Sequence, residues 1–199
     1  MGRRLGRRHL VGLAVKVAVL FARGDSIYKT MRGCDVYDIE RDARTFDGSC
    51  PVVAHPPCRA WGRLRQFAKP VEGEKELAFF AVDMVRQCGG VLEHPSWSTL
   101  WAAAELPKPG QPADRFGGRS IEVRQHWWGH KAEKKTWLYF VGIDRWDSVQ
   151  MPIEPPTHVI RKKPRPTGKL KSLHKKLREA TPPAFAEYLV RHARRARRP

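Results

Sequence analysis

The stretch Pro51-Val52-Val53-Ala54-His55-Pro56-Pro57-Cys58 decides the fold. Its first half is a short apolar run of the kind that forms a strand buried on both faces of a sheet. Two consecutive prolines cannot continue a central strand, because proline lacks the amide hydrogen that the strand ladder needs. We therefore predict a strand over residues 51–54 and a stiff loop that carries Cys58 out of the sheet.

Similar short apolar runs lie on both sides of this stretch, and helical patterns lie between them. We predict further strands over residues 13–21, 34–39, 91–92 and 136–143. Apolar residues spaced three and four apart predict an amphipathic helix over 74–88, with a short helix over 26–31 and a last one from about 182 past 189. This alternation of strands and helices predicts an α/β fold with a doubly wound, mostly parallel sheet.

Polar clusters fall at the predicted strand ends, where ligands sit in such sheets. They are Arg23-Gly24-Asp25, Asp38, His55 to Cys58, and Glu93-His94. We expect positive charge from nearby arginines to lower the pKa of the Cys58 thiol, and burial to raise the pKa of Glu93 so that it can hold a proton. A buried structural cysteine, an ion-paired Glu93 and a helix-capping Asp38 are the plainer interpretations.

The charge of the chain points to polyanions as partners. It has 38 lysines and arginines against 20 acidic residues, a net charge of +18. Such a surface binds phosphate backbones and releases their counterions; an acidic membrane surface is the competing target. Four cysteines without a Cys-x-x-Cys pair indicate a reducing, cytoplasmic compartment, and no apolar run is long enough to span a membrane.

Composition divides the chain into four segments. We expect a disordered basic arm over 1–10, the α/β domain over 11–150, a basic linker rich in proline and lysine over 151–180, and a C-terminal helix with a disordered basic tail over 181–199. A secretory signal is the alternative interpretation of the N-terminus, but Lys16 interrupts its apolar run.

Six stretches, in order along the chain, resemble motifs of the DNA cytosine-5 methyltransferases, in a small phage or prophage-like version. Residues 19–24 resemble the loop that cradles S-adenosyl-L-methionine, 37–39 the acidic second-strand motif, and 55–58 the Pro-Pro-Cys nucleophile loop. Residues 92–95 resemble the Glu-Asn-Val motif, 134–142 the Gln-x-Arg-x-Arg segment, and 181–186, more faintly, the final motif that returns to the cofactor pocket.

This resemblance implies a Rossmann-like methyltransferase domain, S-adenosyl-L-methionine as methyl donor, and a chemistry. A Cys58 thiolate would add to carbon 6 of a flipped cytosine, Glu93 would support the adduct at ring nitrogen 3, and Lys135 would stand where the family places an arginine. The donor-binding positions would be Phe21, Ala22, Gly24, Asp38, Ile39, His55 and Pro56. The positions that contact nucleic acid would be Arg59, Arg63, Arg65, Lys134, Lys162 and Lys163. Double-stranded DNA in a restriction-modification setting is the implied partner, in the host cytoplasm if the chain is phage-encoded; RNA stays open.

The chain also departs from the family. Arg23 replaces a small residue of the first motif, the Glu-Asn-Val position reads Glu-His-Pro, and only residues 108–124 and the basic tail are left to recognise a target sequence. Two alternatives remain. One is a zinc site drawn from the histidines and Cys58, namely His55, Cys58, His94, His126 and His130. The other is a non-catalytic nucleic-acid-binding or anti-restriction accessory protein that uses basic arms and tryptophans.

Overall fold

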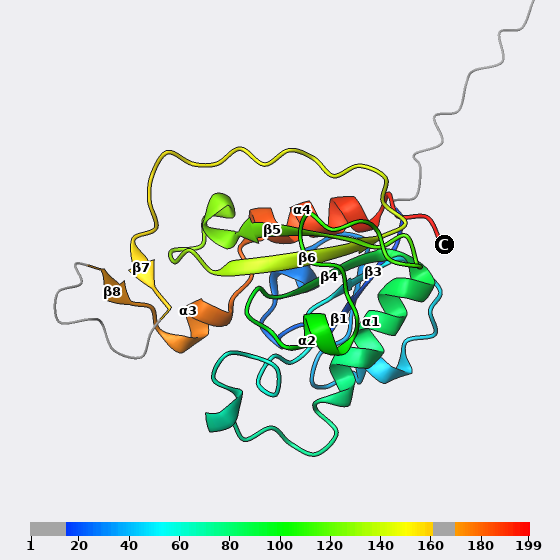
Figure 1. Cartoon of the computed structure of the whole chain (residues 1–199), viewed down its shortest axis with the longest axis horizontal. Coiled ribbons are helices and arrows are strands. Elements are labelled where there is room, and N and C mark those ends of the chain that lie inside the picture. The colour runs from blue at the N-terminus through cyan, green and yellow to red at the C-terminus, as the bar shows by residue number, and fades with distance from the viewer. Residues whose placement is uncertain (1–14, 161–169) are drawn as a thin grey trace, which may run out of the picture.

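The computed structural model describes residues 15–160 and 170–199. The predicted N-terminal arm, and Lys162 and Lys163 of the basic linker, lie outside the described residues. Within them the chain forms one α/β unit around a six-stranded sheet (Figure 1). The predicted fold class is confirmed at this level.

The six strands are hydrogen-bonded in the order β2-β1-β3-β4-β6-β5. Their bounds are β1 (Val17–Leu20), β2 (Cys34–Val36), β3 (Val52–Ala54), β4 (Gly90–Pro95), β5 (Arg119–Arg124) and β6 (Lys135–Val141). β1 to β4 are mutually parallel, whereas β6 is antiparallel to both β4 and β5. A separate parallel pair joins β7 (His158–Val159) to β8 (Lys171–Ser172).

The sequence pattern found five of these strands and missed β5. Residues 119–124 read Arg-Ser-Ile-Glu-Val-Arg and only Ser120 and Val123 are buried, so this edge strand carries charges that hide its apolar positions. β4 is longer than predicted, because Glu93, His94 and Pro95 continue the ladder opposite β6. The strands β1 and β2 are shorter than their apolar runs and end at Leu20 and Val36.

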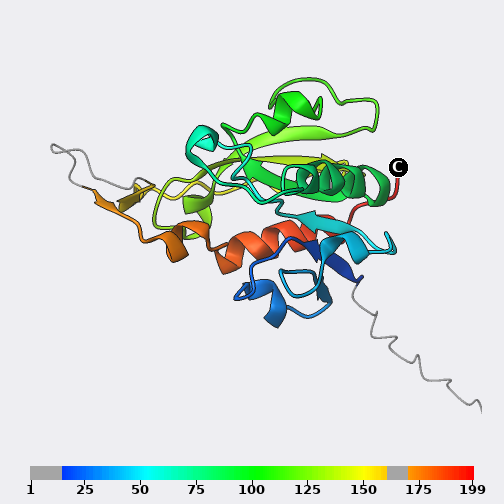
Figure 2. The same ribbon diagram turned by 90° about the horizontal axis from the view of Figure 1, so that it is seen from below.

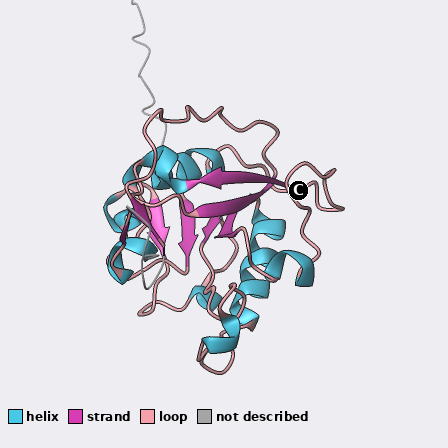
Figure 3. Cartoon of the chain, turned by 60° about the vertical axis from the view of Figure 1, so that its left-hand side comes forward, coloured by secondary structure: helices cyan, strands magenta, loops and turns pink. Residues whose placement is uncertain are grey.

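The sheet lies between two helical layers (Figures 2 and 3). The α-helices are α1 (Glu76–Cys88), α2 (Leu100–Ala103), α3 (Lys175–Glu179) and α4 (Pro183–Ala193), and the 3-10 helices are η1 (Ile27–Thr30), η2 (Ala43–Thr45), η3 (Arg65–Phe67) and η4 (Gln125–Trp128). One core packs α1 and α2 against alternate side chains such as Val52 and Leu92. The other packs α4 against their neighbours Val53 and Val91, as the two-residue period of a strand requires.

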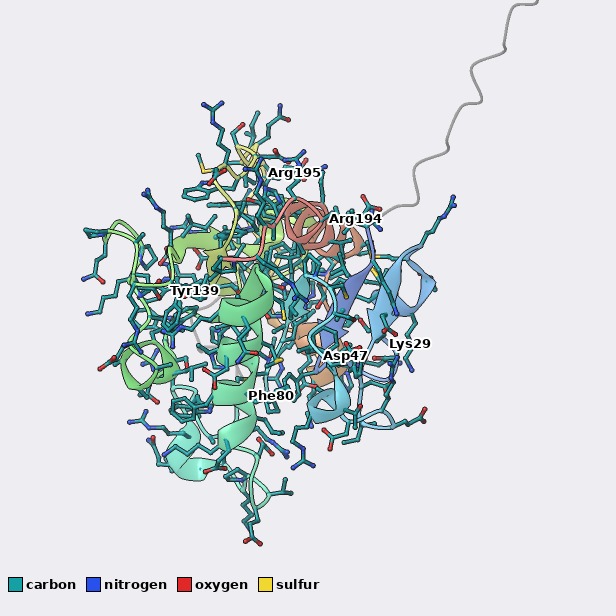
Figure 4. The ribbon with its side chains drawn as sticks, turned by 90° about the vertical axis from the view of Figure 1, so that its right-hand side faces the viewer. Lys29, Asp47, Phe80, Tyr139, Arg194 and Arg195 are labelled. Carbon is teal, nitrogen blue, oxygen red and sulfur yellow. The ribbon has the colours of Figure 1, made fainter. Side chains whose placement is uncertain are left out.

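Helix α4 is part of this core and not an appended extension. Phe185, Ala186 and Leu189 are fully buried against the sheet. The basic tail after it, expected to be disordered, also docks: the Arg197 amide donates to the Gly142 carbonyl at 2.8 Å, and Arg195 pairs with Asp147 at 2.8 Å. Figure 4 shows Arg194 and Arg195 at the end of α4, across the sheet from Phe80 of α1. The physical reason is a close approach of backbones that only glycine permits, since a Cβ on Gly142 would overlap Arg197.

The carboxyl ends of β1 to β4 lie at one edge of the sheet, which we call the carboxyl edge. Because β6 is antiparallel, its first residues lie at this same edge. Helices α3 and η4 are at this end of the molecule and the C-terminus is at the other (Figure 1). Among the described residues, no helix is long and apolar enough to cross a membrane.

Candidate active site at the carboxyl edge

The carboxyl edge contains the point where the strand order reverses. After β1 the chain moves to one side to form β2, and it then crosses back to form β3 on the other side. In doubly wound sheets the crevice at such a switch point is where ligands bind. The loops that leave β1 and β3 begin here, with Phe21 and His55, so the geometry brings two of the predicted polar clusters together.

A chain of hydrogen bonds joins Tyr28, His55 and Glu93 across three elements. The His55 Nδ1 lies 2.9 Å from Glu93 Oε2, and the Tyr28 hydroxyl lies 2.9 Å from His55 Nε2. The Glu93 carboxylate only accepts hydrogen bonds, so the proton of this pair is on His55 Nδ1. His55 is therefore a partner of Glu93, a role different from the donor-binding one that the family resemblance implies.

The second oxygen of Glu93 is held from the other side by Gln125. The Gln125 Nε2 donates to Glu93 Oε1 at 3.0 Å and to Thr136 Oγ1 at 3.1 Å. Gln125 and Thr136 are each 1% exposed. The carboxylate is thus fixed by one donor on each oxygen, with 13% of the Glu93 side chain open to solvent.

This environment reverses the protonation state expected for Glu93. Burial raises the pKa of the carboxyl group, but the hydrogen bond and charge of His55, with Lys134 and His94, lower it to about 2. The prediction of a raised pKa is wrong because His55 is 38 residues away in the chain and the sequence pattern did not pair the two. Glu93 is a carboxylate at neutral pH.

Cys58 stands exposed on the loop after the two prolines. Its pKa is raised, first by partial desolvation of the sulfur and then by the Glu93 carboxylate, while Lys134 acts in the opposite direction. The thiol is therefore near enough to both groups to sense their charges. The expected lowering of this pKa is wrong, since the nearby arginines do not dominate the sulfur.

The arginines that follow Cys58 are directed to other partners or to solvent. Arg59 forms a two-pronged ion pair with Glu74, whose side chain is 3% exposed. Arg63 and Arg65 are exposed. Arg59 thus anchors the loop. The positive charge that acts on Cys58 comes instead from Lys134, the residue directly before β6.

Lys134 rather than Lys135 is the lysine that faces Glu93 and Cys58. Burial lowers its pKa, and Glu93, Cys58 and Glu179 raise it in part. Its backbone has a φ of 42°, a left-handed conformation that a lysine seldom adopts. Lys135 is the first residue of β6, opposite Arg124, and its side chain lines a separate cavity with Trp97 and Trp137.

The loop proposed to cradle the methyl donor follows β1. Phe21 is left-handed, with a φ of 61°, and packs edge-on against Phe80. Ala22 is buried, and a Cβ built on Gly24 would meet nothing within 4 Å, which leaves open space at that point. Pro56 is also buried, behind the Cys58 loop.

Asp38 and Ile39 lie at the end of β2 with contrasting environments. The Asp38 Oδ1 accepts from the amides of Glu40 and Arg41, and Oδ2 pairs with Lys29 at 2.5 Å. These donors, Lys29 first, lower the pKa of Asp38. Ile39 beside it is 92% exposed. Asp38 thus caps a turn and not the following helix, whose N-cap is Asp42, and Ile39 offers a bare apolar surface.

Helix α3 docks on the first loop through Arg23. The Arg23 guanidinium binds both oxygens of Asp25 and donates to the Lys176 carbonyl at 2.8 Å. Lys176 Nζ also pairs with Asp25 at 3.3 Å. The last part of the segment expected to be a linker therefore packs against the carboxyl edge.

Two residues of the site, Tyr28 and Gln125, were not found by sequence reasoning. Tyr28 is 1% exposed in η1, and Gln125 follows β5, the strand that the pattern missed. The signal available for Gln125 was its position two residues after Val123, which continues the buried side of the strand. In the described part of the chain, no group of three or more His, Cys, Asp or Glu side chains is placed to hold a metal ion.

The opposed charges around Cys58 predict how fast it reacts. Glu93→Gln removes the negative charge that raises the thiol pKa, so alkylation of Cys58 by iodoacetamide at pH 8 is expected to accelerate about two- to tenfold. Lys134→Met removes the positive charge and is expected to slow it by a similar factor. Mass spectrometry of the Cys58 peptide measures both rates, and equal rates in all three proteins would contradict the arrangement.

Comparison of the chain with protein-family models, with curated proteins and with solved structures finds no match.

Proposed function

We propose that the protein is an S-adenosyl-L-methionine-dependent, DNA cytosine-5 methyltransferase-like enzyme that acts through Cys58 and Glu93. The observation that carries the proposal is the meeting of these two groups at the switch point. An exposed thiol on a proline-stiffened loop lies within the electrostatic reach of a fixed carboxylate and of Lys134. A cysteine and a glutamate are also the residues that the resemblance of 55–58 and 92–95 to the family motifs implies at these positions.

The geometry assigns Glu93 the part of an anion. The exocyclic amino group of a cytosine would donate to its carboxylate, and the negative charge would favour protonation of ring nitrogen 3. The proton can come from a protonated His55, whose Nδ1–H donates to the Glu93 carboxylate at 2.9 Å. Tyr28 and Gln125 keep this pair in position.

Cys58 supplies the nucleophile. Its raised pKa keeps the thiol protonated in the free protein, so loss of the proton accompanies substrate binding. The thiolate forms a bond to carbon 6, and the displaced electron pair makes carbon 5 nucleophilic. With S-adenosyl-L-methionine bound, carbon 5 would take its methyl group and release S-adenosyl-L-homocysteine; loss of the carbon 5 proton to solvent would then re-form the ring double bond and expel the sulfur. A duplex base would first be flipped out, at a cost of a few kcal/mol.

Two features of the loops after β1 and β2 support a methyl donor beside the switch point. Open space at Gly24 and the bare side chain of Ile39 lie on the loops after β1 and β2, beside the switch point. S-adenosyl-L-methionine would supply an electrophilic methyl group there. Asp38 would receive ribose hydroxyls only if Lys29 gave way, since the two now form an ion pair.

The direct test is methyl transfer. The full-length protein is incubated with labelled S-adenosyl-L-methionine and mixed-sequence DNA, and the DNA is digested to nucleosides. Label in 5-methylcytosine is the expected result. DNA retention with no label and no heat of S-adenosyl-L-methionine binding would overturn the proposal.

The Asp38–Lys29 ion pair also favours a second candidate, a methyltransferase-derived protein that binds nucleic acid without catalysis. In that case the acidic group of the donor site is permanently engaged. DNA retention would then fall steeply with salt, as phosphate contacts require, and would not change with Cys58→Ser. A measured affinity for S-adenosyl-L-methionine would exclude this candidate.

A further inference from the structure

Beside the candidate active site, a shallow cavity of about 90 Å³ is lined by Ser96, Trp97, Glu122, Lys135 and Trp137. We propose that this cavity, the Trp97 notch, binds the nucleobase of the nucleotide next to the target. The inference rests on the proposed function, because it takes nucleic acid as the substrate. The notch would let the protein recognise the base beside its target, although residues 108–124 and the basic tail leave little room for a separate recognition domain.

The first argument is the exposed indole. All seven tryptophans lie in the described part of the chain, and among them only Trp97 is exposed, at 65%. Trp137 forms a fixed wall beside it: its indole nitrogen donates to Glu122 at 3.0 Å, and its ring packs on Trp101 at 5.3 Å. A free aromatic face next to a rigid one suits a planar base, which gains stacking energy regardless of its identity.

The second argument is the polar edge of the notch. The Ser96 hydroxyl is buried and has no hydrogen-bond partner among the described residues. The Glu122 carboxylate is exposed, and the structure shows Trp137 bound to one of its oxygens. Lys135 adds a cation. An aromatic face, carboxylate and hydroxyl acceptors, and a lysine match a base with an exocyclic amino group and its phosphate.

The third argument is position. Ser96 follows Glu93 by three residues at the end of β4, roughly 10 Å along an extended chain. Side chains alternate along β4 and β6, so the notch lies on the face of Trp137 and Glu93 points to the other face; a nucleic acid strand that passes over the carboxyl edge would reach both. Lys134 senses Glu93 and Cys58, whereas its neighbour Lys135 lines the notch. The two lysines would thus contact the strand on the two sides of the carboxyl edge, and the notch would prefer adenine or cytosine beside the target.

The test compares Trp97→Ala and Trp97→Phe with Ile153→Ala, which removes an exposed apolar side chain that does not line the notch. Affinity for a short cytosine-containing oligonucleotide is measured by fluorescence anisotropy, without methyl donor. Trp97→Ala is expected to weaken binding roughly 5- to 100-fold, while Trp97→Phe keeps an aromatic face and stays within a few-fold. Equal affinities for Trp97→Ala and Ile153→Ala would overturn the notch.

Two further results separate this inference from the proposed function. Replacing the neighbouring base with an abasic site should lower the affinity of the wild-type protein by the same factor as Trp97→Ala does. It should change the affinity of the Trp97→Ala variant little. If that pattern appears without methyl transfer, the notch stands and the enzymatic proposal fails. If methyl transfer occurs and Trp97→Ala changes neither affinity nor neighbour preference, the notch fails alone.

Discussion

Cys58→Ser is expected to reduce methyl transfer about 10³-fold or more, because a serine hydroxyl is far less nucleophilic and far less acidic than a thiol. Binding to DNA is expected to stay unchanged, since the substitution removes no charge. The matched control is Cys50→Ser, which alters a half-buried cysteine outside the Cys58 loop. Incorporation of labelled methyl groups and filter retention of DNA measure the two properties in parallel.

A trapped adduct gives the same prediction a covalent readout. DNA with fluorine on carbon 5 of cytosine has no proton to lose at that carbon, so the bond between sulfur and carbon 6 would persist after methyl transfer. We expect a protein–DNA species in denaturing gels for the wild type and for Cys50→Ser, and its absence for Cys58→Ser. Trapping in Cys58→Ser would place the nucleophile elsewhere.

The second large effect is a loss of stability in mild acid that depends on His94. Burial first, with His55 acting in the same direction, lowers the pKa of this 1% exposed ring from 6.5 to about 4. The unfolded chain binds a proton more readily than the folded one, so the stabilisation is complete above pH 6.5 and is lost as pH falls toward 4. A shift of this size corresponds to roughly 3 kcal/mol of unfolding free energy.

Urea titrations at pH 7.5, 5.5 and 4.5 measure this loss. In His94→Phe, a ring of similar shape replaces an imidazole whose two nitrogens lack hydrogen-bond partners in the described structure, and the decline should largely disappear. His174→Asn is the control, because it changes an exposed histidine and keeps a side-chain acceptor for the Lys176 amide. A decline of equal size in His94→Phe would contradict the assignment.

Glu93 also makes the protein less stable as pH falls, but over a lower pH range than His94 does. Its folded-state pKa of about 2 is below its ordinary value of 4.5, so its contribution is complete above about pH 4.5 and is lost as pH falls toward 2. Glu93→Gln should remove the part of the decline that lies below pH 4.5. It should leave the part due to His94 largely in place.

Much of the fold could be predicted from the sequence because its central strands are continuous apolar runs. The runs at Val17–Leu20, Val52–Ala54 and Lys135–Val141 are buried along most of their length, and the two prolines after β3 end that strand as expected. Edge elements could not be predicted in this way. β5 owes its place to pairing with β6, and a half-exposed strand with three charged residues resembles a loop in sequence.

The sequence predicted the main residues of the candidate site but not the directions of their pKa shifts. Cys58 and Glu93 are brought to one edge because Cys58 follows β3 and Glu93 lies in the second half of the parallel strand β4, a rule that needs only the strand assignment. Their protonation states depend instead on His55 and Lys134, which come from separate elements. Charge in the neighbouring sequence, such as Arg59, was a poor guide, since Arg59 is paired with the buried Glu74.

The covering of β1 and β3 by α4 has a consequence for how the molecule assembles. Val17 and Val53 share one apolar core with Phe185 and Leu189, about 130 to 170 residues later in the chain. Contacts of such long sequence separation require large loops to close before any burial repays the lost chain entropy. Folding is therefore expected to be slow and concerted, with neither half of the chain able to hide its apolar surface alone.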